Sequence, residues 1–493
     1  MKRTKILLCV LMTICMCSCN TGHQLHIPDK NEDFLVEILK NGKWKEIPVH
    51  NAKVSDYVGN PEAGYQQYDM GFAMFTDDFK EPVKVRVTKK DGFNSVCARP
   101  TSYGIEMQRC SNKKVEFTIT DPGKKISVEF DGDRMQNLFI LPDLPDADIP
   151  EGDNVIYYGP GIHDAGEIKL EWWNNATIYI DSEAIVYGRI VANRCDSLTI
   201  RGRGILCSSK ENHGEGRKPQ IETYACNHLT IEGIMLRDTP NWTIKVVGSD
   251  HVHVNNIKEI GWIMNSDGMD FLCCRHVLVE NTFQRNYDDN VTIKAFNASP
   301  EYIRKNSETD GSYKDWTIGM VEGLDKFDVY DIEVRNCVFW ADKAHNMLVG
   351  PESRGVTFSD IRFHDNIVLE NRQDDDTYPG TMAVMIADNG IFKNVTFENI
   401  QVEDINGGKI FCVQFTNAWA YQEKYGQNLD GITFRNISYT GKRATAARVH
   451  GLDEKHSISN VLIDNFTVNG KKVDVEDKEY ISINKYVDNI EVK

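Results

Sequence analysis

Apolar and polar residues alternate in a short pattern that recurs from about residue 195 to the end of the chain. Each copy reads apolar, any, apolar, any, then Asn, Gly or Asp, and a second short apolar run follows. The nine copies begin at Leu198, Leu229, Val252, Val277, Ile332, Ile361, Val395, Ile432 and Val461. Period-two alternation turns one face of a short strand inward. The fifth residue, mostly Asn, tolerates the left-handed backbone of a tight corner.

The spacing of the copies is that of a solenoid. Successive copies start 31, 23, 25, 55, 29, 34, 37 and 29 residues apart, and the longest interval has room for two coils or for one coil and a long loop. Stacking pairs each strand with the next coil and buries a continuous apolar interior. We therefore predict an all-β fold with a right-handed parallel β-helix over residues 150–493. Leucine-rich repeats are shorter and dominated by Leu, so they do not fit.

Residues 25–145 follow a different pattern. Alternating stretches such as VKVRVTKK from Val83 and KISVEFDG from Lys125 are separated by Gly, Asp and Asn turns. Such segments are typical of antiparallel strands, and we predict a small antiparallel β-sandwich before the β-helix. A Pro- and Asp-rich link from Leu141 then leads to a first coil near Val155.

The first residues predict export. MKRTK is basic, and the apolar run Ile6–Met16 is too short to cross a bilayer as a helix. The M-C-S-C stretch that follows resembles a bacterial lipobox, so residues 1–19 are predicted to be a lipoprotein-type signal with Cys19 as the acylated residue. We expect a periplasmic or cell-surface lipoprotein of a bacterium, held at the membrane through its lipid alone.

Charge and cysteine content narrow the possible partners. The net charge of −17 argues against nucleic acid, since binding phosphates needs basic patches. Nine cysteines follow Cys19, an odd number without a C-x-x-C pair, which argues against a disulfide framework and against a zinc site. One bridge, such as Cys97 to Cys110, stays open, as does the oligomeric state. We expect no metal and no cofactor.

Carboxylates are concentrated on two neighbouring coils, in N-S-D-G-M-D from Asn265 and N-Y-D-D-N from Asn286. Asp267 and Asp288 are 21 residues apart, close to one coil, and equivalent positions of stacked coils lie about 4.8 Å apart. Asp267, Asp288 and Asp289 should therefore face one cleft, and at least one pKa should rise because like charges repel. Adjacent Asp288 and Asp289 both reach that cleft only if the chain turns or bulges there.

Such a cluster suits hydrolysis of a glycosidic bond. The reaction needs a protonated acid near the leaving oxygen and an ionised carboxylate that takes a proton from water. A single Asp at a β-helix corner is often only a turn residue, so it is the convergence of three that favours a site. Asp270 lies three positions along the strand from Asp267 and would face the other way, which favours a structural role.

These motifs resemble the N-T-D-G and G-D-D motifs of the polygalacturonase and dextranase clan, glycoside hydrolase families 28 and 49. The resemblance is strongest over residues 229–294 and implies that Asp288 is the general acid while Asp267 and Asp289 activate water, with inversion and without cofactor. Family 49 is nearer in layout, because its members also place a β-sandwich before the β-helix and have a Y-F-G-P-G segment similar to Y-Y-G-P-G from Tyr157.

Two departures from family 28 bear on the substrate. The G-H-G motif has only an approximate counterpart at His345, and the R-I-K motif that holds a uronate is absent, which favours a neutral α-linked polysaccharide or oligosaccharide. Predicted substrate-binding residues are His345, Lys294, Asn265 and Trp262, with Trp316 and Trp340 as further aromatic candidates for stacking on sugar. Residues 298–326, in the longest interval, are predicted to form a wall of the cleft.

Two other functions fit the same pattern. A β-helix polysaccharide lyase would need a calcium site and an Arg or Lys base that acts on an acidic sugar. A non-catalytic glycan-binding or adhesive β-helix would need none of the aspartates for its activity.

Overall fold

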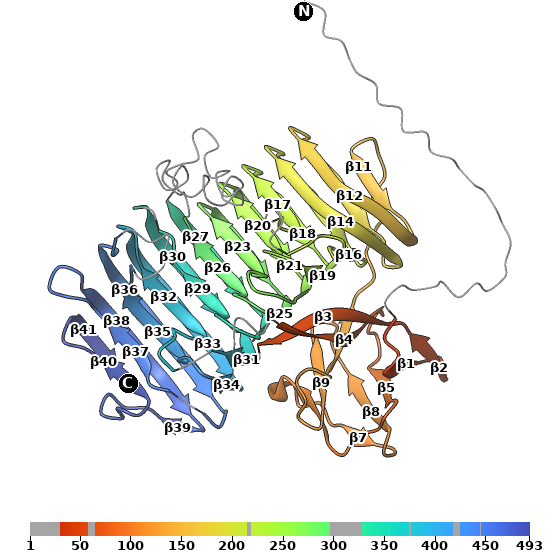
Figure 1. Ribbon diagram of the computed structural model, residues 1–493, viewed down its shortest axis with the longest axis horizontal. Helices are drawn as coiled ribbons and strands as arrows, with labels where there is room; N and C mark the ends of the chain where they lie inside the picture. Colours follow the sequence, from red (N-terminus) through yellow and green to blue (C-terminus); the bar gives the residue numbers. More distant parts are fainter. Residues whose placement is uncertain are drawn as a thin grey trace, which may run out of the picture.

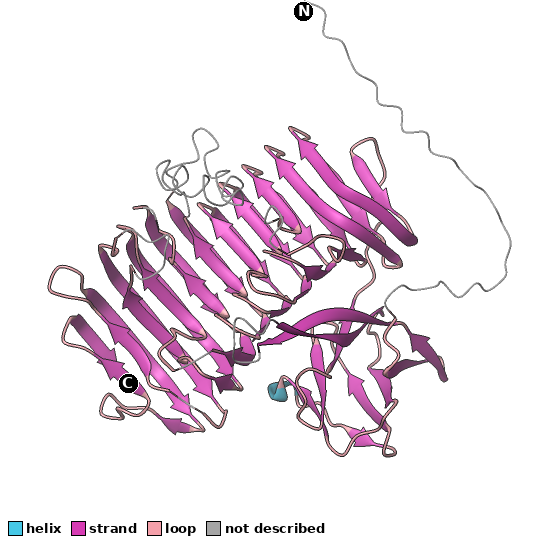
Figure 2. Ribbon diagram, viewed as in Figure 1, coloured by secondary structure: helices cyan, strands magenta, loops and turns pink. Residues whose placement is uncertain are grey.

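The computed structural model describes residues 30–57, 65–213, 218–295, 328–353, 355–373, 376–417, 424–443 and 445–493. Within these ranges strands account for almost all regular structure, and the helical element is a single 3-10 turn, η2 (Thr101–Tyr103) (Figure 2). No helix in the described ranges is long and apolar enough to cross a membrane. The predicted signal with Cys19, the predicted cleft wall at 298–326 and Trp316 lie outside the described residues.

Two five-stranded sheets form the predicted sandwich, and a shared apolar core lies between them. The first sheet is antiparallel, in the order β2 (Lys43–Ile47), β1 (Phe34–Lys40), β5 (Val83–Lys89), β8 (Lys114–Ile119) and β7 (Gln108–Arg109). The second has the order β3 (Val49–Tyr57), β4 (Tyr65–Thr76), β10 (Leu138–Asp143), β9 (Ile126–Phe130) and β6 (Val96–Arg99). One pair differs from the antiparallel prediction, since β10 runs parallel to β4. Parallel neighbours need a crossover, and strands β5 to β9 supply it.

From Val155 onward the chain forms a right-handed parallel β-helix with three columns of strands (Figure 1). Column 1 contains β11 (Val155–Tyr158), β13 (Thr177–Ile180), β15 (Thr199–Gly202), β18 (Leu229–Glu232), β21 (Asp250–Asn255), β24 (Arg275–Glu280), β27 (Val329–Arg335), β30 (Thr357–His364) and β41 (Val487–Val492). Column 2 contains β16 (Ile205–Cys207), β19 (Met235–Thr239), β22 (Lys258–Gly261), β25 (Phe283–Asn286), β28 (Val338–Ala341), β31 (Ile367–Arg372) and β34 (Ile405–Asn406).

Column 3 contains β17 (Ile221–Tyr224), β20 (Ile244–Val247), β23 (Met269–Leu272), β26 (Val291–Lys294), β29 (Met347–Val349), β32 (Met382–Ile386), β35 (Phe411–Phe415), β37 (Ala447–His450) and β40 (Ile481–Ile483). Longer strands span two columns: β12 (Gly161–Glu171) and β14 (Ala184–Asn193) span columns 2 and 3, and β33 (Ile391–Val402), β36 (Asn428–Tyr439) and β38 (Ile458–Val468) span columns 1 and 2. The short β39 (Lys471–Lys472) pairs antiparallel with β38.

The corner between columns 1 and 2, which we name the asparagine corner, holds the fifth residue of the eight sequence repeats from Leu229 onward. These residues have left-handed φ between 52° and 81°: Gly233, Asn256, Asn281, Asn336, Asp365, Asn399, Asn436 and Asn465. Several of their amides form a ladder from coil to coil, as Asn436 Nδ2 donates to Asn399 Oδ1 at 2.8 Å and Asn465 Nδ2 to Asn436 Oδ1 at 2.9 Å. The predicted left-handed corner is confirmed.

Apolar side chains fill the interior of the β-helix in register. Phe363, Phe397 and Phe434 stack on successive coils with ring centroids 5.2 Å apart. The nine described cysteines are all free, so the bridge between Cys97 and Cys110 is not formed.

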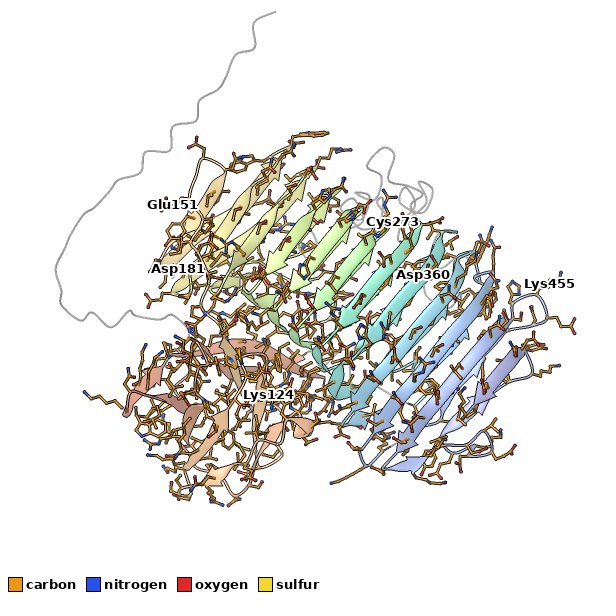
Figure 3. The ribbon with its side chains drawn as sticks, turned by 180° about the vertical axis from the view of Figure 1, so that it is seen from behind. Lys124, Glu151, Asp181, Cys273, Asp360 and Lys455 are labelled. Atoms are coloured by element: carbon orange, nitrogen blue, oxygen red, sulfur yellow. The ribbon has the colours of Figure 1, made fainter. Side chains whose placement is uncertain are left out.

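Column 2 packs against the sandwich, so both of its faces are buried (Figure 3). Phe139 of β10 meets Phe283 at 4.8 Å and Trp340 at 6.4 Å between ring centroids. Charged groups cross the same interface, among them the buried pair of Lys258 and Asp143. The sandwich is therefore joined to the middle of the β-helix by apolar and ionic contacts together.

Candidate active site

The corner between columns 2 and 3, which we name the aspartate corner, gathers the predicted site. Trp242, Asp267, Asp289 and His345 occupy the same position on successive coils, two residues before the paired strands β20, β23, β26 and β29. Backbone bonds keep this register at the corner itself, since Gly268 N donates to Asp289 O at 2.7 Å and Asn290 N to His345 O at 2.8 Å. One row of side chains thus follows the corner along the helix axis.

Asp267, Asp288 and Asp289, the aspartate cluster, present carboxylate oxygens that all lie within 4.8 Å of one another. Asp288 is held by its own corner, because its oxygens accept from the backbone N–H of Asn265 at 3.0 Å and of Asp289 at 3.1 Å. The chain turns between β25 and β26, as predicted, and this turn brings the adjacent side chains of Asp288 and Asp289 into one group.

The register differs by one residue from the simplest prediction. Met269 pairs with Val291, an offset of 22, so Asp289 and not Asp288 lies directly beside Asp267 on the next coil. Asp288 joins the cluster from the turn. The spacing of 21 residues was close enough to place the aspartates together but not to say which two are stacked.

His345 lies one coil beyond Asp289 although 56 residues separate them, because Val291 pairs directly with Met347. Its Nδ1 is 2.6 Å and its backbone N is 2.9 Å from Asp289 Oδ1. The ring is fully buried and lies 5.0 Å from the ring of Tyr378. His345 therefore donates two hydrogen bonds to a single carboxylate oxygen.

Lys294 is buried among carboxylates, with 4% of its surface exposed. Its Nζ lies 2.7 Å from Asp270, 3.4 Å from Asp267 and 3.7 Å from Glu352, and 4.3 Å from the centre of the Trp242 ring. Burial lowers the pKa of Lys294, but the surrounding carboxylates outweigh burial and raise it above its usual value. Its ammonium group is thus paired with these acids, and its predicted contact with sugar stays a prediction.

The three pKa values of the aspartate cluster diverge. Burial and the neighbouring Asp289 raise the pKa of Asp288 to about 6. Burial, followed by the charges of Asp270 and Asp288, raises the pKa of Asp267 well above its usual range. Burial also acts on Asp289, but the charge and hydrogen bonds of His345 outweigh it and lower the pKa of Asp289. At mildly acidic pH, below about 6, the cluster therefore keeps Asp289 ionised beside protonated Asp267 and Asp288.

A polar group inside the β-helix supports the corner from behind. Asn286 donates to Glu259 at 2.9 Å and to Asn290 at 2.8 Å, and it accepts from Gly261 N at 3.1 Å. Burial raises the pKa of Glu259 to about 8, against hydrogen bonds that act the other way, so this acid is neutral at pH 7. Gly268 passes so close that an added Cβ would lie 2.2 Å from Glu259 Oε1.

Known proteins provide an independent comparison. The sequence matches the model of glycosyl hydrolases family 28 over residues 164–375, a range that contains the whole aspartate cluster and His345. The fold is similar to Dex49A from Penicillium minioluteum, with a TM-score of 0.55 and 12% identity over 94% of each chain. A family 28 exopolygalacturonase from Yersinia enterocolitica has a TM-score of 0.46 and 11% identity, over 84% of this chain and 97% of its own. No curated protein matches.

The chain resembles the polygalacturonase and dextranase clan. At 12% identity the likeness to Dex49A is one of fold, and its coverage of 94% includes the sandwich as well as the β-helix.

The remaining residues that were predicted to bind substrate differ in burial and lie around the aspartate cluster. Asn265 contributes its backbone N–H to Asp288, and its side chain is half-buried. Trp262 is half-buried beside the sandwich, with Lys53 Nζ 5.2 Å from its ring centre. Trp340 is fully buried beneath Arg285 at the sandwich interface and cannot stack on a sugar.

Two residues of the site, Trp242 and Glu352, were not predicted from the sequence. Trp242 was detectable, because it precedes the apolar, any, apolar strand Ile244–Val247 by the same two residues as Asp267 precedes Met269–Leu272. Glu352 has no such signal, since it follows β29 in a turn. Burial raises its pKa to about 7, against the charge of Lys294.

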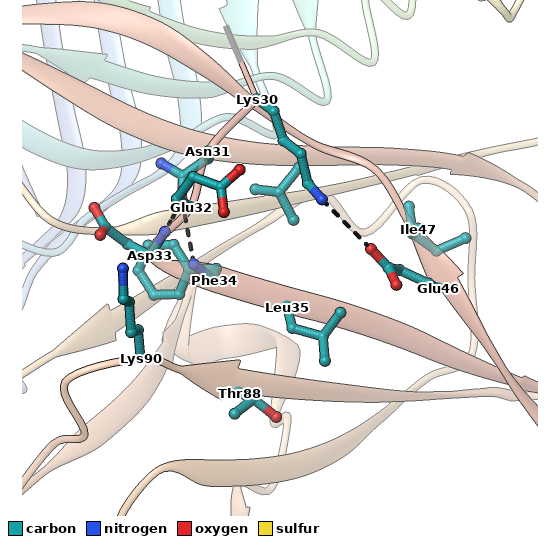
Figure 4. Close-up of a pocket in the computed structure, with 11 residues that line it drawn as sticks. Lys30, Asn31, Glu32, Asp33, Phe34, Leu35, Glu46, Ile47, Thr88 and Lys90 are labelled. Carbon is teal, nitrogen blue, oxygen red and sulfur yellow. Dashed lines mark hydrogen bonds and ion pairs between the residues drawn. The ribbon is translucent and has the colours of Figure 1, made fainter. Parts of the chain in front are cut away.

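A separate pocket lies in the sandwich, where the ion pair of Lys30 and Glu46 crosses it at 3.9 Å (Figure 4). It is lined by Lys30, Asn31, Glu32, Asp33, Phe34, Leu35, Glu46, Ile47, Val49, Thr88 and Lys90. None of these belongs to the β-helix, so this pocket is no part of the aspartate corner.

Proposed function

We propose that the protein is an inverting glycoside hydrolase that acts on an α-linked polysaccharide or oligosaccharide. The observation that carries the proposal is a set of three carboxylates within 4.8 Å, one with a lowered pKa and two with raised pKa values. Groups driven apart in pKa by their surroundings are what acid and base catalysis at one bond requires.

In this mechanism Asp288 gives its proton to the glycosidic oxygen as the bond to the anomeric carbon breaks. Asp289, ionised beside His345, takes a proton from the water that attacks the same carbon. Asp267 faces both and orients the water. The products are two sugar hydroxyl groups, and a proton returns from Asp289 to Asp288 through solvent to restore the starting state.

The stereochemical outcome rests on the third carboxylate. Inverting enzymes with two carboxylates usually hold them about 6.5–9.5 Å apart and retaining enzymes about 5–5.5 Å apart, so the 4.8 Å spacing taken alone favours retention through a nucleophilic aspartate. We favour inversion because the ionised Asp289 and the protonated Asp267 can hold one water between them while Asp288 donates its proton.

The charge balance of the site favours a neutral sugar. Among the residues that the structure describes, two basic side chains lie beside the aspartate cluster, Lys294 and His345, and both are paired with carboxylates. A uronate would need a cation free to meet it. The raised pKa of Lys294 also makes it a poor base for the β-elimination of a lyase.

The first test is activity of the full chain on a panel of plant, bacterial and host α-glycans, with the anomer of the first product read by NMR. We expect an inverted anomer, no unsaturated product and no loss of rate with a chelator. Asp288→Asn should lower kcat by about 10³-fold, since it removes the proton donor, and should not lower the Tm, because a like charge leaves the cluster.

Asp360→Asn is the matched control. Asp360 has a left-handed φ of 55°, but it lies within β30 of column 1 and accepts from Asn394 at 3.0 Å. This variant should keep full activity. Glycan binding that Asp288→Asn leaves intact, in a protein without hydrolytic activity, would instead identify a binding module, and a retained anomer would make an aspartate the nucleophile.

A further inference from the structure

A buried ion-pair network joins the sandwich to the aspartate corner. The carboxylate of Asp342 receives Arg285 Nε at 2.8 Å and Nη2 at 3.0 Å, and Trp340 Nε1 at 3.0 Å. Arg134, from the sandwich, donates its Nη1 to the same carboxylate at 2.7 Å. The side chains of Arg285 and Asp342 are 0% and 1% exposed. Four donors thus converge on one buried carboxylate.

This network lies at the start of two of the three loops that carry the site. Arg285 precedes Asp288 by three residues, and Asp342 precedes His345 by three residues. The two loops run side by side, because Asp342 N donates to Asn286 O at 2.8 Å and His345 N to Asp289 Oδ1 at 2.9 Å. A single carboxylate therefore ties together the beginnings of the Asp288–Asp289 loop and the His345 loop.

The sandwich closes the network from outside the β-helix. Besides its bond to Asp342, Arg134 accepts at its backbone O from Arg285 Nη1 at 2.9 Å, and its Nη2 pairs with Asp56 of β3. Met70 of β4 contacts Arg285 Nη1 at 3.0 Å through its sulfur. Arg285 is thus held on one side by Asp342 of the next coil and on the other by two segments of the sandwich.

We propose that Asp342, with Arg285 and Arg134, is a positioning residue that fixes His345 against Asp289, so that the sandwich is a working part of the active site. This inference rests on the proposed function. A carboxylate that is bonded to both the Asp288–Asp289 loop and the His345 loop fixes the position of one loop relative to the other. This matters for the rate, because a displacement of about 1 Å at reacting groups costs about 10²-fold in rate.

The molecule contains a matched control for this role. Arg99 of the sandwich donates its Nε to Glu403 Oε2 at 2.7 Å, again across the interface, with 12% and 8% of the side chains exposed. Glu403 follows β33 and lies two coils beyond Trp340. The first step is from β28 to β31, where Trp340 pairs with Glu370, and the second is from β31 to β33, where Val368 pairs with Val402. It is a cross-interface ion pair of the same kind that touches neither loop of the site.

The experiment compares Asp342→Asn with Glu403→Gln in the full chain, on a substrate that the wild-type protein cleaves. We expect Asp342→Asn to lower kcat by about 30-fold or more with KM changed less than about twofold, in line with lost placement of the reacting groups. The acid limb of its pH profile should move to higher pH as His345 loosens from Asp289. Glu403→Gln should show a similar fall in Tm but an unchanged kcat and pH profile.

Equal effects of the two variants on kcat would overturn the inference and leave only a docking role. Should Asp342→Asn not fold, Arg134→Gln removes only the sandwich partner and keeps the pair of Arg285 and Asp342. We expect it to lower kcat by about threefold to tenfold at unchanged KM, and an unchanged kcat would again refute positioning. Full activity in Asp288→Asn would refute the proposed function itself, so the two failures are distinguishable.

Discussion

The two corners on either side of column 2 are built on opposite principles. At the asparagine corner nearly every coil repeats one residue type with a left-handed φ, and neutral amides bond to the amides of the neighbouring coil. At the aspartate corner the equivalent position holds Trp242, Asp267, Asp289 and His345 in turn. The connections there also vary, with seven, four and five residues between the flanking strands of these last three coils.

This contrast separates stability from chemistry within one solenoid. A residue that repeats on every coil solves a problem that every coil has, namely turning a tight corner. A residue that breaks the repeat while keeping its register has another task. Five carboxylates are buried around one lysine at the aspartate corner: those of the aspartate cluster, Asp270 and Glu352. Burying them lowers the free energy of unfolding. The asparagine corner, which is built mainly of neutral amides, has no such cost.

Of the changes that test the contrast between the two corners, removal of His345 from the aspartate corner should have the largest effect on kcat. Activity needs Asp288 protonated and Asp289 ionised. The rate should therefore fall as pH rises above about 6, where Asp288 loses its proton. On the acid side the rate should fall only at a pH below the usual pKa range of an aspartate, where Asp289 becomes protonated. His345→Ala removes the cation and donor that lower the pKa of Asp289. That pKa then rises, the acid limb moves to higher pH, and kcat at the optimum should fall by about 10²-fold.

The measurement is a pH profile of kcat for both proteins. The alkaline limb, set by Asp288, serves as the internal control because it should hardly move. An acid limb that stays where it is would mean that His345 does not govern Asp289.

A methyl group at Gly268 should break the aspartate corner by crowding. Its Cβ would lie 2.2 Å from Glu259 Oε1 and 2.5 Å from Asn286 Nδ2, atoms fixed inside the β-helix. We expect Gly268→Ala to lose about 1–3 kcal/mol of unfolding free energy and at least about tenfold in kcat, because Asp267 is the preceding residue.

Gly123→Ala is the matched control for this change. In that sandwich turn the added Cβ meets only the Asp121 side chain, at 3.2 Å. Chemical denaturation and initial rates should leave this variant close to wild type, and a Gly268→Ala protein that behaved the same way would contradict the close packing behind the corner.

The smallest effect is expected at the asparagine corner. Asn436→Ala removes two ladder bonds and puts a methyl-bearing residue at a φ of 52°, which should cost about 1–2 kcal/mol of stability. Asn436→Gly loses the same bonds without the backbone strain and should be less destabilised. Both variants should hydrolyse substrate at the wild-type rate. A fall in kcat without a fall in Tm would contradict a purely structural role for the asparagine corner.

Much of this architecture was predictable from sequence because column 1 faces solvent on one side. Its strands alternate strictly, and the Asn after Val277–Glu280 or Ile432–Arg435 marks each corner. Column 2 is buried on both faces, so its strands show no alternation, and Trp340 looked like a candidate for sugar stacking when it is part of the sandwich interface.

The site was predictable in composition but not in detail. The aspartate cluster stands out by charge density, whereas the burial of Lys294 depends on neighbours such as Glu352 that only the fold brings near. His345 was predicted as a substrate-binding residue, but its place one coil beyond Asp289 could not be predicted, because the long interval had room for two coils or for one coil and a long loop. The network of Arg285, Asp342 and Arg134 joins residues up to 208 positions apart, and no local pattern records it.

The connection from column 3 to column 1 has one further consequence. It takes two residues after β23 but 34 after β26, and yet Val277 still pairs with Ile332 and Val291 with Met347. Backbone pairing on either side closes the ring whatever length of chain leaves it. A segment of different length or sequence can therefore be placed at this connection without changing the pairing of the coils on either side.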